Sequence, residues 1–380
     1  MRPTAAGGGR PWVVMAGGGT AGHVTPALAI AGALVDAGHD PRSIHFVGSR
    51  RGIEGRLVPA AGFPVTLLPG RGLVRRADRA NLLAAAGLLG ATAMAIVLVG
   101  RWRPGAVVSV GGYAAAPAVA AALVWRVPVV LAEANAVPGA VNRLAGRFAA
   151  AAAVAFPGTP LPRAVVTGNP IRPAMAAIER SPQARREARV ALGYPEGVRL
   201  VAVAGGSLGA GRLNEAVLDL ARGWADRGDL AVHHVVGERN ADGLARRRPR
   251  LPPGGLTYRQ VAFEERMDLL YAAADVTVQR AGASTVAELA AAGIPSVLVP
   301  LPRSPGGHQE RNAAALAAAG GAVVVDDAAL DGDRLMSVLD GLLGDPGLLE
   351  RMGAASRALA VPDAAARVAA LVETHARRPR

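Results

Sequence analysis

A histidine at the end of a glycine-rich loop is the first residue of this sequence that could do acid–base chemistry. The loop reads GGGTAGH over 17–23, and a helical pattern of apolar residues begins at His23. The positive end of a helix dipole favours the neutral, proton-accepting form of an imidazole. The spacing is equally compatible with a general base and with a histidine that only bonds the start of its helix.

The same loop satisfies the pattern G-x-G-x-x-G, in which backbone N–H groups and a helix dipole can receive an anion. A dinucleotide dehydrogenase would carry an acid near the end of the following strand to bind ribose. Here the residues 48–51 read GSRR, whose arginines could bind the extra phosphate of NADP. An NADP-dependent oxidoreductase therefore stays open, as does a turn with no ligand.

Polar residues at two later helix starts could bind a nucleotide sugar. A second glycine loop, GGSLGAG at 205–211, offers the Ser207 hydroxyl and backbone donors that suit a diphosphate. Glu288 stands alone in the apolar helical segment 286–292, where it could accept hydrogen bonds from ribose hydroxyls or simply face solvent. Further polar side chains, His308, Gln309 and Asn312, follow a proline-rich loop and could bond sugar hydroxyls.

The elements that must position these residues alternate between apolar runs and helical patterns. Runs typical of buried strands cover 12–16, 43–47, 106–110, 127–132, 200–204, 231–235, 275–278 and 295–299. This alternation predicts an α/β fold of two Rossmann-like doubly wound domains. Ligands bind beyond the carboxyl ends of strands in such sheets, so we expect both glycine loops to open into a central cleft that the domains face.

The domain boundaries follow from length and from one proline-rich segment. A chain of 380 residues suits two domains, and TGNPIRP at 167–173 interrupts the pattern because proline disfavours helix in the preceding residue. We predict a polar leader over 1–10, a first domain over 11–167 and a linker over 168–173. A second domain covers 174–361, and a closing helix within 362–380 packs back on the first domain.

Composition restricts the partners. The formal charge of +13 favours an anionic partner, but no zinc pattern or basic–aromatic interleaving points to nucleic acid. The absence of cysteine excludes disulfides and thiolate metal sites. The sequence Asp331-Gly332-Asp333 precedes a late helix and is interpreted as a cap and turn. We therefore predict neither a metal nor a cofactor, and residues 1–10 show no signal peptide.

An uncharged run at 80–100 is long enough to span a membrane. Arginines flank it at 71, 75, 76, 79, 101 and 103. A crossing would cut the first domain in two, so we favour an interfacial or partly buried helix whose basic flanks attract anionic lipid. A wholly buried helix is the alternative.

Six segments, taken in order, resemble the MurG family of peptidoglycan UDP-N-acetylglucosamine:undecaprenyl-diphospho-muramoylpentapeptide transferases. They read GGGTAGHVTPALAIA from Gly17, SVGGYAAAP from Ser109, GNPIR from Gly168, GGSLGA from Gly205, GASTVAELAAAGIPSVLVP from Gly282 and HQERNA from His308. The resemblance spans nearly the whole chain. It implies a GT-B fold, with the donor bound chiefly by the second domain and the acceptor by the first.

The resemblance also implies roles for individual residues. His23 would deprotonate the C4 hydroxyl of N-acetylmuramic acid in lipid I, giving lipid II with inversion at the sugar. Glu288 would hold the ribose hydroxyls, and Ser207 would contact the diphosphate. The other implied substrate-binding residues are Thr20, Ala21, Gly22 and Asn135 on the acceptor side, Arg172, Phe263, Glu264 and Met267 on the uracil side, and Ala283, Ser284, His308 and Gln309 around the donor.

The resemblance also implies the binding partners and the cellular location of the protein. The donor is UDP-N-acetylglucosamine, the acceptor is an undecaprenyl-linked lipid, and the protein is a peripheral protein on the cytoplasmic side of the cell membrane. Departures from the family pattern occur at Ala132, Ala134, Leu208 and Gly307, where polar or acidic residues are usual. They leave open a protein that binds a nucleotide sugar without turnover.

Overall fold

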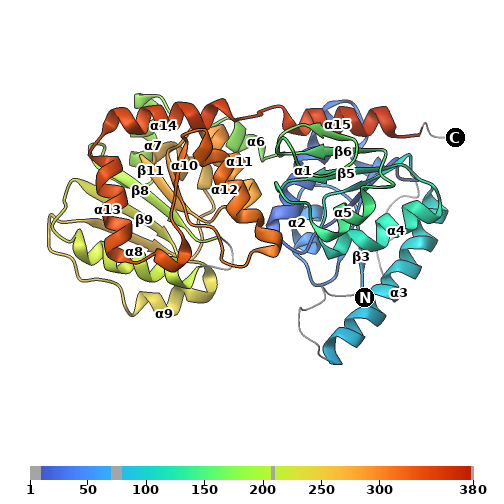
Figure 1. Ribbon diagram of the computed structural model, residues 1–380, viewed down its shortest axis with the longest axis horizontal. Helices are drawn as coiled ribbons and strands as arrows, with labels where there is room; N and C mark the ends of the chain where they lie inside the picture. Colours follow the sequence, from blue (N-terminus) through green and yellow to red (C-terminus); the bar gives the residue numbers. More distant parts are fainter. Residues whose placement is uncertain (1–9, 70–78, 207–209, 378–380) are drawn as a thin grey trace. The chain divides into compact units, whose positions relative to one another are not determined.

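The computed structural model describes residues 10–69, 79–206 and 210–377, which form two compact units (Figure 1). Unit 1 contains the chain up to Arg172 together with the segment from Val361 onward, and unit 2 is Pro173–Ala360. The last helix, α15 (Ala364–His375), therefore belongs to unit 1, where Val368 and Val372 are buried in the core. Each unit is described by itself below.

A seven-stranded parallel sheet forms the centre of unit 1, in the order β3-β2-β1-β4-β5-β6-β7. Its strands are β1 (Val13–Ala16), β2 (Ile44–Ser49), β3 (Val65–Leu68), β4 (Ala106–Ser109), β5 (Val129–Glu133), β6 (Ala151–Val154) and β7 (Ala164–Val166). The connections leave β1 in one direction and β4 in the other. The loops after β1 and β4 consequently flank the switch point, where ligands bind in such sheets.

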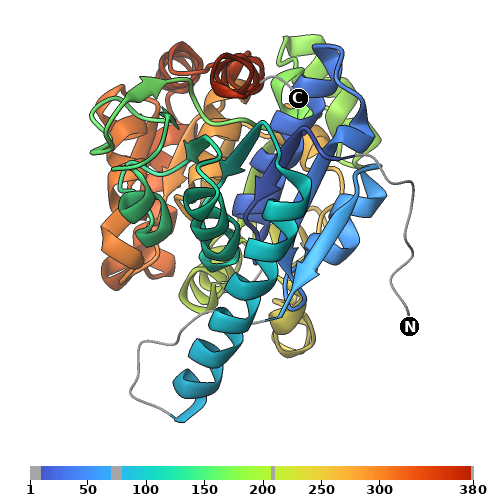
Figure 2. The same ribbon diagram turned by 90° about the vertical axis from the view of Figure 1, so that its right-hand side faces the viewer.

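Helices cover both faces of this sheet, which is why its central strands are apolar throughout. The helices are α1 (Ala21–Asp36), α2 (Glu54–Ala60), α3 (Arg79–Trp102), α4 (Ala116–Val124), α5 (Ala140–Ala145) and α15. Val13 and Met15 face the core under α1 and α15, whereas Val14 and Ala16 face the core under α3 and α4. Figure 2 shows the long helix α3 in front of the strands, beside α4.

Unit 2 repeats this architecture with six parallel strands in the order β10-β9-β8-β11-β12-β13. The strands are β8 (Arg199–Ala204), β9 (Leu230–Val235), β10 (Thr257–Val261), β11 (Val276–Gln279), β12 (Ser296–Leu298) and β13 (Ala322–Val324). The helices are α6 (Pro173–Ala176), α7 (Pro182–Ala191), α8 (Gly211–Gly223), α9 (Ala241–Ala245), α10 (Met267–Ala273), α11 (Ala283–Ala292), α12 (His308–Ala318), α13 (Gly332–Leu343) and α14 (Pro346–Ala358). Its switch point lies between β8 and β11.

The eight predicted strands are all present, each with its ends within two residues of the prediction. The prediction missed β3, β6, β7, β10 and β13. Alanine favours strands weakly, so AAAV of β6 gave no signal, and β7 and β13 have three residues each. Asp331 caps α13 by accepting a hydrogen bond from the Arg334 N–H at 2.8 Å, which confirms the predicted cap.

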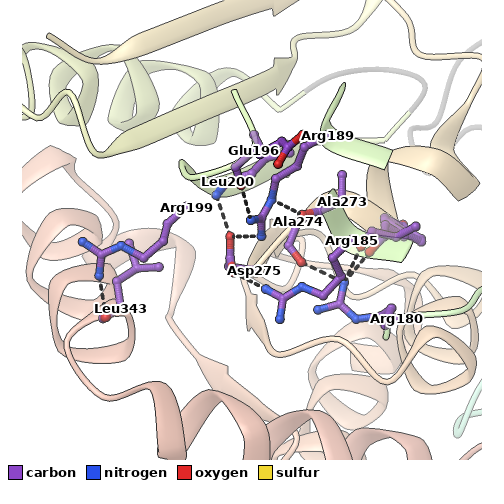
Figure 3. Close-up of polar contacts among 12 residues, drawn as sticks. Arg180, Arg185, Arg189, Glu196, Arg199, Leu200, Ala273, Ala274, Asp275 and Leu343 are labelled. Carbon is purple, nitrogen blue, oxygen red and sulfur yellow. Dashed lines mark hydrogen bonds and ion pairs between the residues drawn. The ribbon is translucent and has the colours of Figure 1, made fainter. Parts of the chain in front are cut away.

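A cluster of arginines around Asp275 joins α7 to the amino ends of β8 and β11 (Figure 3). Asp275 accepts hydrogen bonds from Arg185, from Arg189 Nη2 at 2.8 Å and from the Leu200 N–H at 2.7 Å. Arg180 donates to carbonyls at the end of α10, including Ala274 O at 2.7 Å, where the helix dipole favours a cation. Burial, together with the neighbouring Arg185, lowers the pKa of Arg180 to about 9.

Replacing Asp275 should destabilise unit 2 strongly. Asp275→Ala leaves the buried Arg189 cation and the Leu200 N–H without their carboxylate, so we expect a loss of about 3–5 kcal/mol in the free energy of unfolding. Urea denaturation followed by circular dichroism measures the loss. Asp229→Ala is the matched control because Asp229 pairs with Arg199 and Arg227 at the surface, and it should cost no more than about 1 kcal/mol. Equal losses of stability in the two variants would contradict the structural role given to Asp275.

Candidate active site

His23 lies at the switch point of unit 1. Helix α1 begins after Thr20, whose backbone carbonyl accepts from the His23 N–H at 3.1 Å and whose Oγ1 lies 3.2 Å from His23 Nδ1. The half-buried imidazole packs against the turn after β4, since a Cβ built on Gly112 would be 3.5 Å from Nδ1. In the tautomer whose Nδ1–H donates to Thr20, Nε2 carries the lone pair that a general base needs.

A buried carboxylate lies under the first glycine loop. Glu54, at the start of α2, is 2% exposed, and its Oε1 accepts from the Gly19 N–H at 2.8 Å and from the Ser49 N–H at 3.2 Å. A Cβ on Gly18 or on Gly52 would overlap this carboxylate. Both glycines are therefore required by its close approach, and Glu54 ties the loop after β1 to the end of β2.

This carboxylate weighs against a dinucleotide. The Gly19 N–H, which would meet a cofactor phosphate in a dehydrogenase, is bonded to Glu54, and the negative charge of an ionised Glu54 would repel a phosphate there. The Gly19 N–H is therefore already bonded within the protein. Donors remain at the first turn of α1, formed by Ala21 and Gly22, because the first N–H groups of a helix have no acceptor within it.

A second buried carboxylate, Glu133 at the end of β5, holds the loop that carries Asn135. Its Oε1 accepts from the backbone N–H and the side-chain Nδ2 of Asn135, at 3.0 and 3.1 Å. Its Oε2 accepts from the Gly139 N–H and from Asn142 Nδ2, both at 3.0 Å. Sequence reasoning gave Glu133 no role, although an acid ending an apolar strand was a usable signal.

A small pocket opens beside these residues in unit 1. Its lining includes Gly22 from the start of α1, Glu133, and Asn169 from the GNPIR segment. The departures Ala132 and Ala134 also line it, so small apolar side chains stand where the family usually has polar ones. Of the predicted acceptor-side residues of unit 1, Gly22 lines this pocket, and His23 follows it in α1, whereas Thr20, Ala21 and Asn135 are not among the lining residues.

In unit 2, the described site candidates all follow the carboxyl ends of strands. Phe263, Glu264 and Met267 follow β10, and Phe263 is 60% exposed. Ala283, Ser284 and Glu288 lie on α11 after β11, and His308 and Gln309 begin α12 after β12. Ser207 and the departure Leu208 lie outside the described residues. Arg172 is exposed at the end of unit 1, and its predicted role toward uracil stays a prediction.

Helix α11 presents Ser284 and Glu288 one turn apart, on the same side of the helix. Ser284 Oγ is buried and has no hydrogen-bond partner among the residues that the structure describes. Gln309 is partly committed to the protein, because its Oε1 accepts from the Leu301 N–H at 2.9 Å. The departure Gly307 precedes α12 with φ of 65°, a conformation that favours glycine over the acid usual there.

Two buried histidines of β9 support this edge of unit 2, and sequence reasoning missed them. His233 Nδ1 lies 3.0 Å from the Tyr194 hydroxyl, and its Nε2 lies 3.1 Å from Glu264 Oε2. His234 bonds the Tyr258 hydroxyl at 2.8 Å and Asn214 Oδ1 at 3.1 Å. Burial lowers the pKa of His233 to about 4 and that of His234 to about 3, so both rings are neutral at pH 7.

Comparison with known protein families identifies the family to which this chain belongs. Residues 13–154 match the glycosyltransferase family 28 N-terminal domain, and residues 200–368 match the family 28 C-terminal domain. The chain belongs to glycosyltransferase family 28 and, within it, to the MurG family.

Curated relatives specify the member of this family that the chain is similar to. A protein of a Nocardioides species is 42% identical over 95% of this chain and 97% of its own length, and one of Streptomyces coelicolor is 40% identical over 90% and 92%. Both are named UDP-N-acetylglucosamine–N-acetylmuramyl-(pentapeptide) pyrophosphoryl-undecaprenol N-acetylglucosamine transferase. The crystal structure of Acinetobacter baumannii MurG is similar with a TM-score of 0.74 and 30% identity, over 95% of this chain and 99% of that one.

The buried histidines predict a loss of stability in acid. Their pKa values are lower in the folded protein than the ordinary 6.5, so below pH 6.5 the unfolded chain binds more protons, and stability falls as the pH drops toward about 3. For the fully buried His234 the loss by pH 4 is on the order of 3 kcal/mol. Urea denaturation at pH 7, 5.5 and 4 should show a smaller pH dependence in His234→Gln. An unchanged dependence would contradict the assignment.

Proposed function

We propose that this chain transfers N-acetylglucosamine from UDP-N-acetylglucosamine to the C4 hydroxyl of N-acetylmuramic acid in an undecaprenyl-linked acceptor, converting lipid I to lipid II for peptidoglycan. The observation that carries the proposal is the full-length similarity to enzymes with this name, joined to a histidine at the switch point of unit 1. Such an activity serves cell-wall synthesis, and with it cell shape and division.

His23 is the proposed base. It takes the proton from the C4 hydroxyl as that oxygen attacks the anomeric carbon of the donor sugar. The bond from this carbon to the diphosphate oxygen breaks in the same step, UDP leaves with the electron pair, and the anomeric centre inverts. The hydrogen bond between Thr20 and Nδ1 supports this role because it fixes the ring orientation.

Unit 2 is the proposed donor site. The starts of α11 and α12 supply backbone N–H groups and positive dipole ends, which suit the negative charge that develops on UDP. Glu288 is proposed to accept hydrogen bonds from ribose, while Phe263, Glu264, Met267 and Arg172 bind the uracil side. Ala283, Ser284, His308 and Gln309 are proposed to surround the sugar and diphosphate, together with Ser207.

The transfer assay and one histidine variant test this proposal together. Wild-type protein should transfer labelled sugar from UDP-N-acetylglucosamine to a short-chain lipid I analogue. His23→Ala should lower kcat by about 10²–10⁴-fold, because that is the usual contribution of a positioned base. The melting-temperature shift on adding UDP-N-acetylglucosamine should persist in this variant.

A histidine far along the chain supplies the control. His375→Ala, at the end of α15, should keep wild-type kcat. Unchanged turnover in His23→Ala would reject His23 as the base. A thermal shift with UDP-N-acetylglucosamine but no transfer by the wild-type protein would favour the non-catalytic sugar-nucleotide-binding alternative.

We also propose that unit 1 docks on the cytoplasmic face of the membrane through α3 and the end of α4. Within the described residues, Ala85–Trp102 is the one helical segment long and apolar enough to cross a membrane. However, its Ala91, Ala95 and Val99 are buried in the core of unit 1. Peripheral attachment leaves this packing intact, whereas a membrane crossing would remove it.

The other side of α3 supports the docking proposal. Leu89 and Val97 are 73% and 69% exposed, and Val124 at the end of α4 is 58% exposed. Arg101 and Arg103 lie at the end of the helix, where they suit anionic headgroups. No nucleic-acid partner is proposed.

Vesicle binding tests the docking surface. Val97→Asp places a charge on an exposed side chain, so it should leave the fold intact and weaken sedimentation with vesicles containing phosphatidylglycerol at least several-fold. Val190→Asp, at a valine of α7 that is 53% exposed in unit 2, is the matched control and should bind like wild type. Equal binding by all three proteins would reject docking through α3.

A further inference from the structure

Asn169 has a side chain whose hydrogen-bonding groups the protein does not use. The residue follows β7 in the GNPIR segment and is 6% exposed. Neither its Oδ1 nor its Nδ2 has a hydrogen-bond partner among the described residues. An unbonded buried amide costs about 1–3 kcal/mol, so a site that keeps one needs a reason.

The backbone around Asn169 is held firmly in place. The Thr167 N–H donates to Val154 O at 3.0 Å and so continues the pairing of β7 with β6. Gly168 has φ of 78°, and a Cβ there would lie 2.5 Å from the Cβ of Val361. The fold therefore fixes the position of the Asn169 backbone.

Asn169 is one of the residues that line the pocket of unit 1, where the carboxylate of Glu133 already has its hydrogen-bond partners. Each oxygen of Glu133 accepts two N–H groups, from Asn135 twice, from Gly139 and from Asn142. Small apolar side chains, including Val110, Ala132 and Ala153, make up much of the remaining wall. Asn169 is consequently the side chain that still requires a hydrogen-bonding partner.

The chemistry of that partner follows from these groups. Nδ2 can donate to a carbonyl oxygen, and Oδ1 can accept an N–H, so an amide of a ligand complements the side chain. An anionic group is disfavoured because the carboxylate of Glu133 lies on the same pocket. Apolar walls of alanine and valine suit a methyl or methylene group next to the amide.

We infer that Asn169 is an acceptor-specificity residue that binds a secondary amide of the acceptor in this pocket. The inference rests on the proposed function, since the acceptor named for the relatives carries an N-acetyl group and a pentapeptide. The N-acetyl group and the peptide both contain secondary amides, and acceptor analogues that lack one or the other distinguish between them. Asn169 acts here on acceptor affinity and not on the donor.

Asn169→Leu tests the inference, because leucine keeps a similar volume without hydrogen-bonding groups. The KM for the short-chain lipid I analogue should rise at least tenfold, while the KM for UDP-N-acetylglucosamine stays unchanged. The melting temperature should not fall, because an unbonded buried polar group is being replaced by an apolar one. Asn240→Leu is the matched control: Asn240 Nδ2 bonds Val236 O at 3.2 Å in unit 2, so this change should leave the acceptor KM unaltered.

Two acceptor analogues identify the amide. One carries a hydroxyl in place of the acetamido group, and the other lacks the peptide. Wild type should show a tenfold higher KM for the analogue that lacks the recognised amide, and Asn169→Leu should not distinguish that analogue from the complete acceptor. An unchanged acceptor KM, equal discrimination by both proteins, or a lower melting temperature in Asn169→Leu would overturn the inference. No transfer to the complete acceptor by wild type would instead reject the proposed function.

Discussion

The reversal of strand order within each parallel sheet is the constraint on which the candidate site depends. At the reversal, the connections after two neighbouring strands lead away in opposite directions, and backbone N–H groups and side chains from both loops meet at one edge. In unit 1 this brings the loop of His23 next to the Gly111–Gly112 turn. In unit 2 the corresponding position lies between β8 and β11, beside the start of α11.

Buried carboxylates then fix the loops that the sheet of unit 1 only brings together. Glu54 accepts backbone N–H groups from the loop after β1 and from the end of β2, and Glu133 accepts four N–H donors from the segment after β5. Using acids in this way makes the loops rigid and removes some of their N–H groups from ligand binding. The first glycine loop, whose pattern resembles that of a dinucleotide-binding loop, therefore has a different role. It positions His23, while its Gly19 N–H is bonded to Glu54 and does not bind a phosphate.

The sequence was informative where local signals are strong. Apolar strands such as β1 and β8, the glycine loops and the proline-containing GNPIR segment could be placed, because each depends on residues near one another in the chain. Strand β6 could not, since four small residues carry no pattern. The partners of Glu54, Glu133 and His233 also escaped prediction, because each contact joins segments that only the folded sheet brings together. The unbonded amide of Asn169 was equally invisible, since burial without a partner is a property of the packed chain.

The return of α15 to unit 1 bears on how the chain folds during synthesis. Unit 2 is continuous from Pro173 to Ala360, so all of its strands and helices are available before the last segment leaves the ribosome. Unit 1 instead lacks the side chains of Val368, Ala369 and Val372 until the segment after unit 2 has been synthesised. The apolar residues of unit 1 that pack against α15 therefore stay uncovered while unit 2 is synthesised. Unit 1 begins earlier in the chain, but its core is completed after that of unit 2.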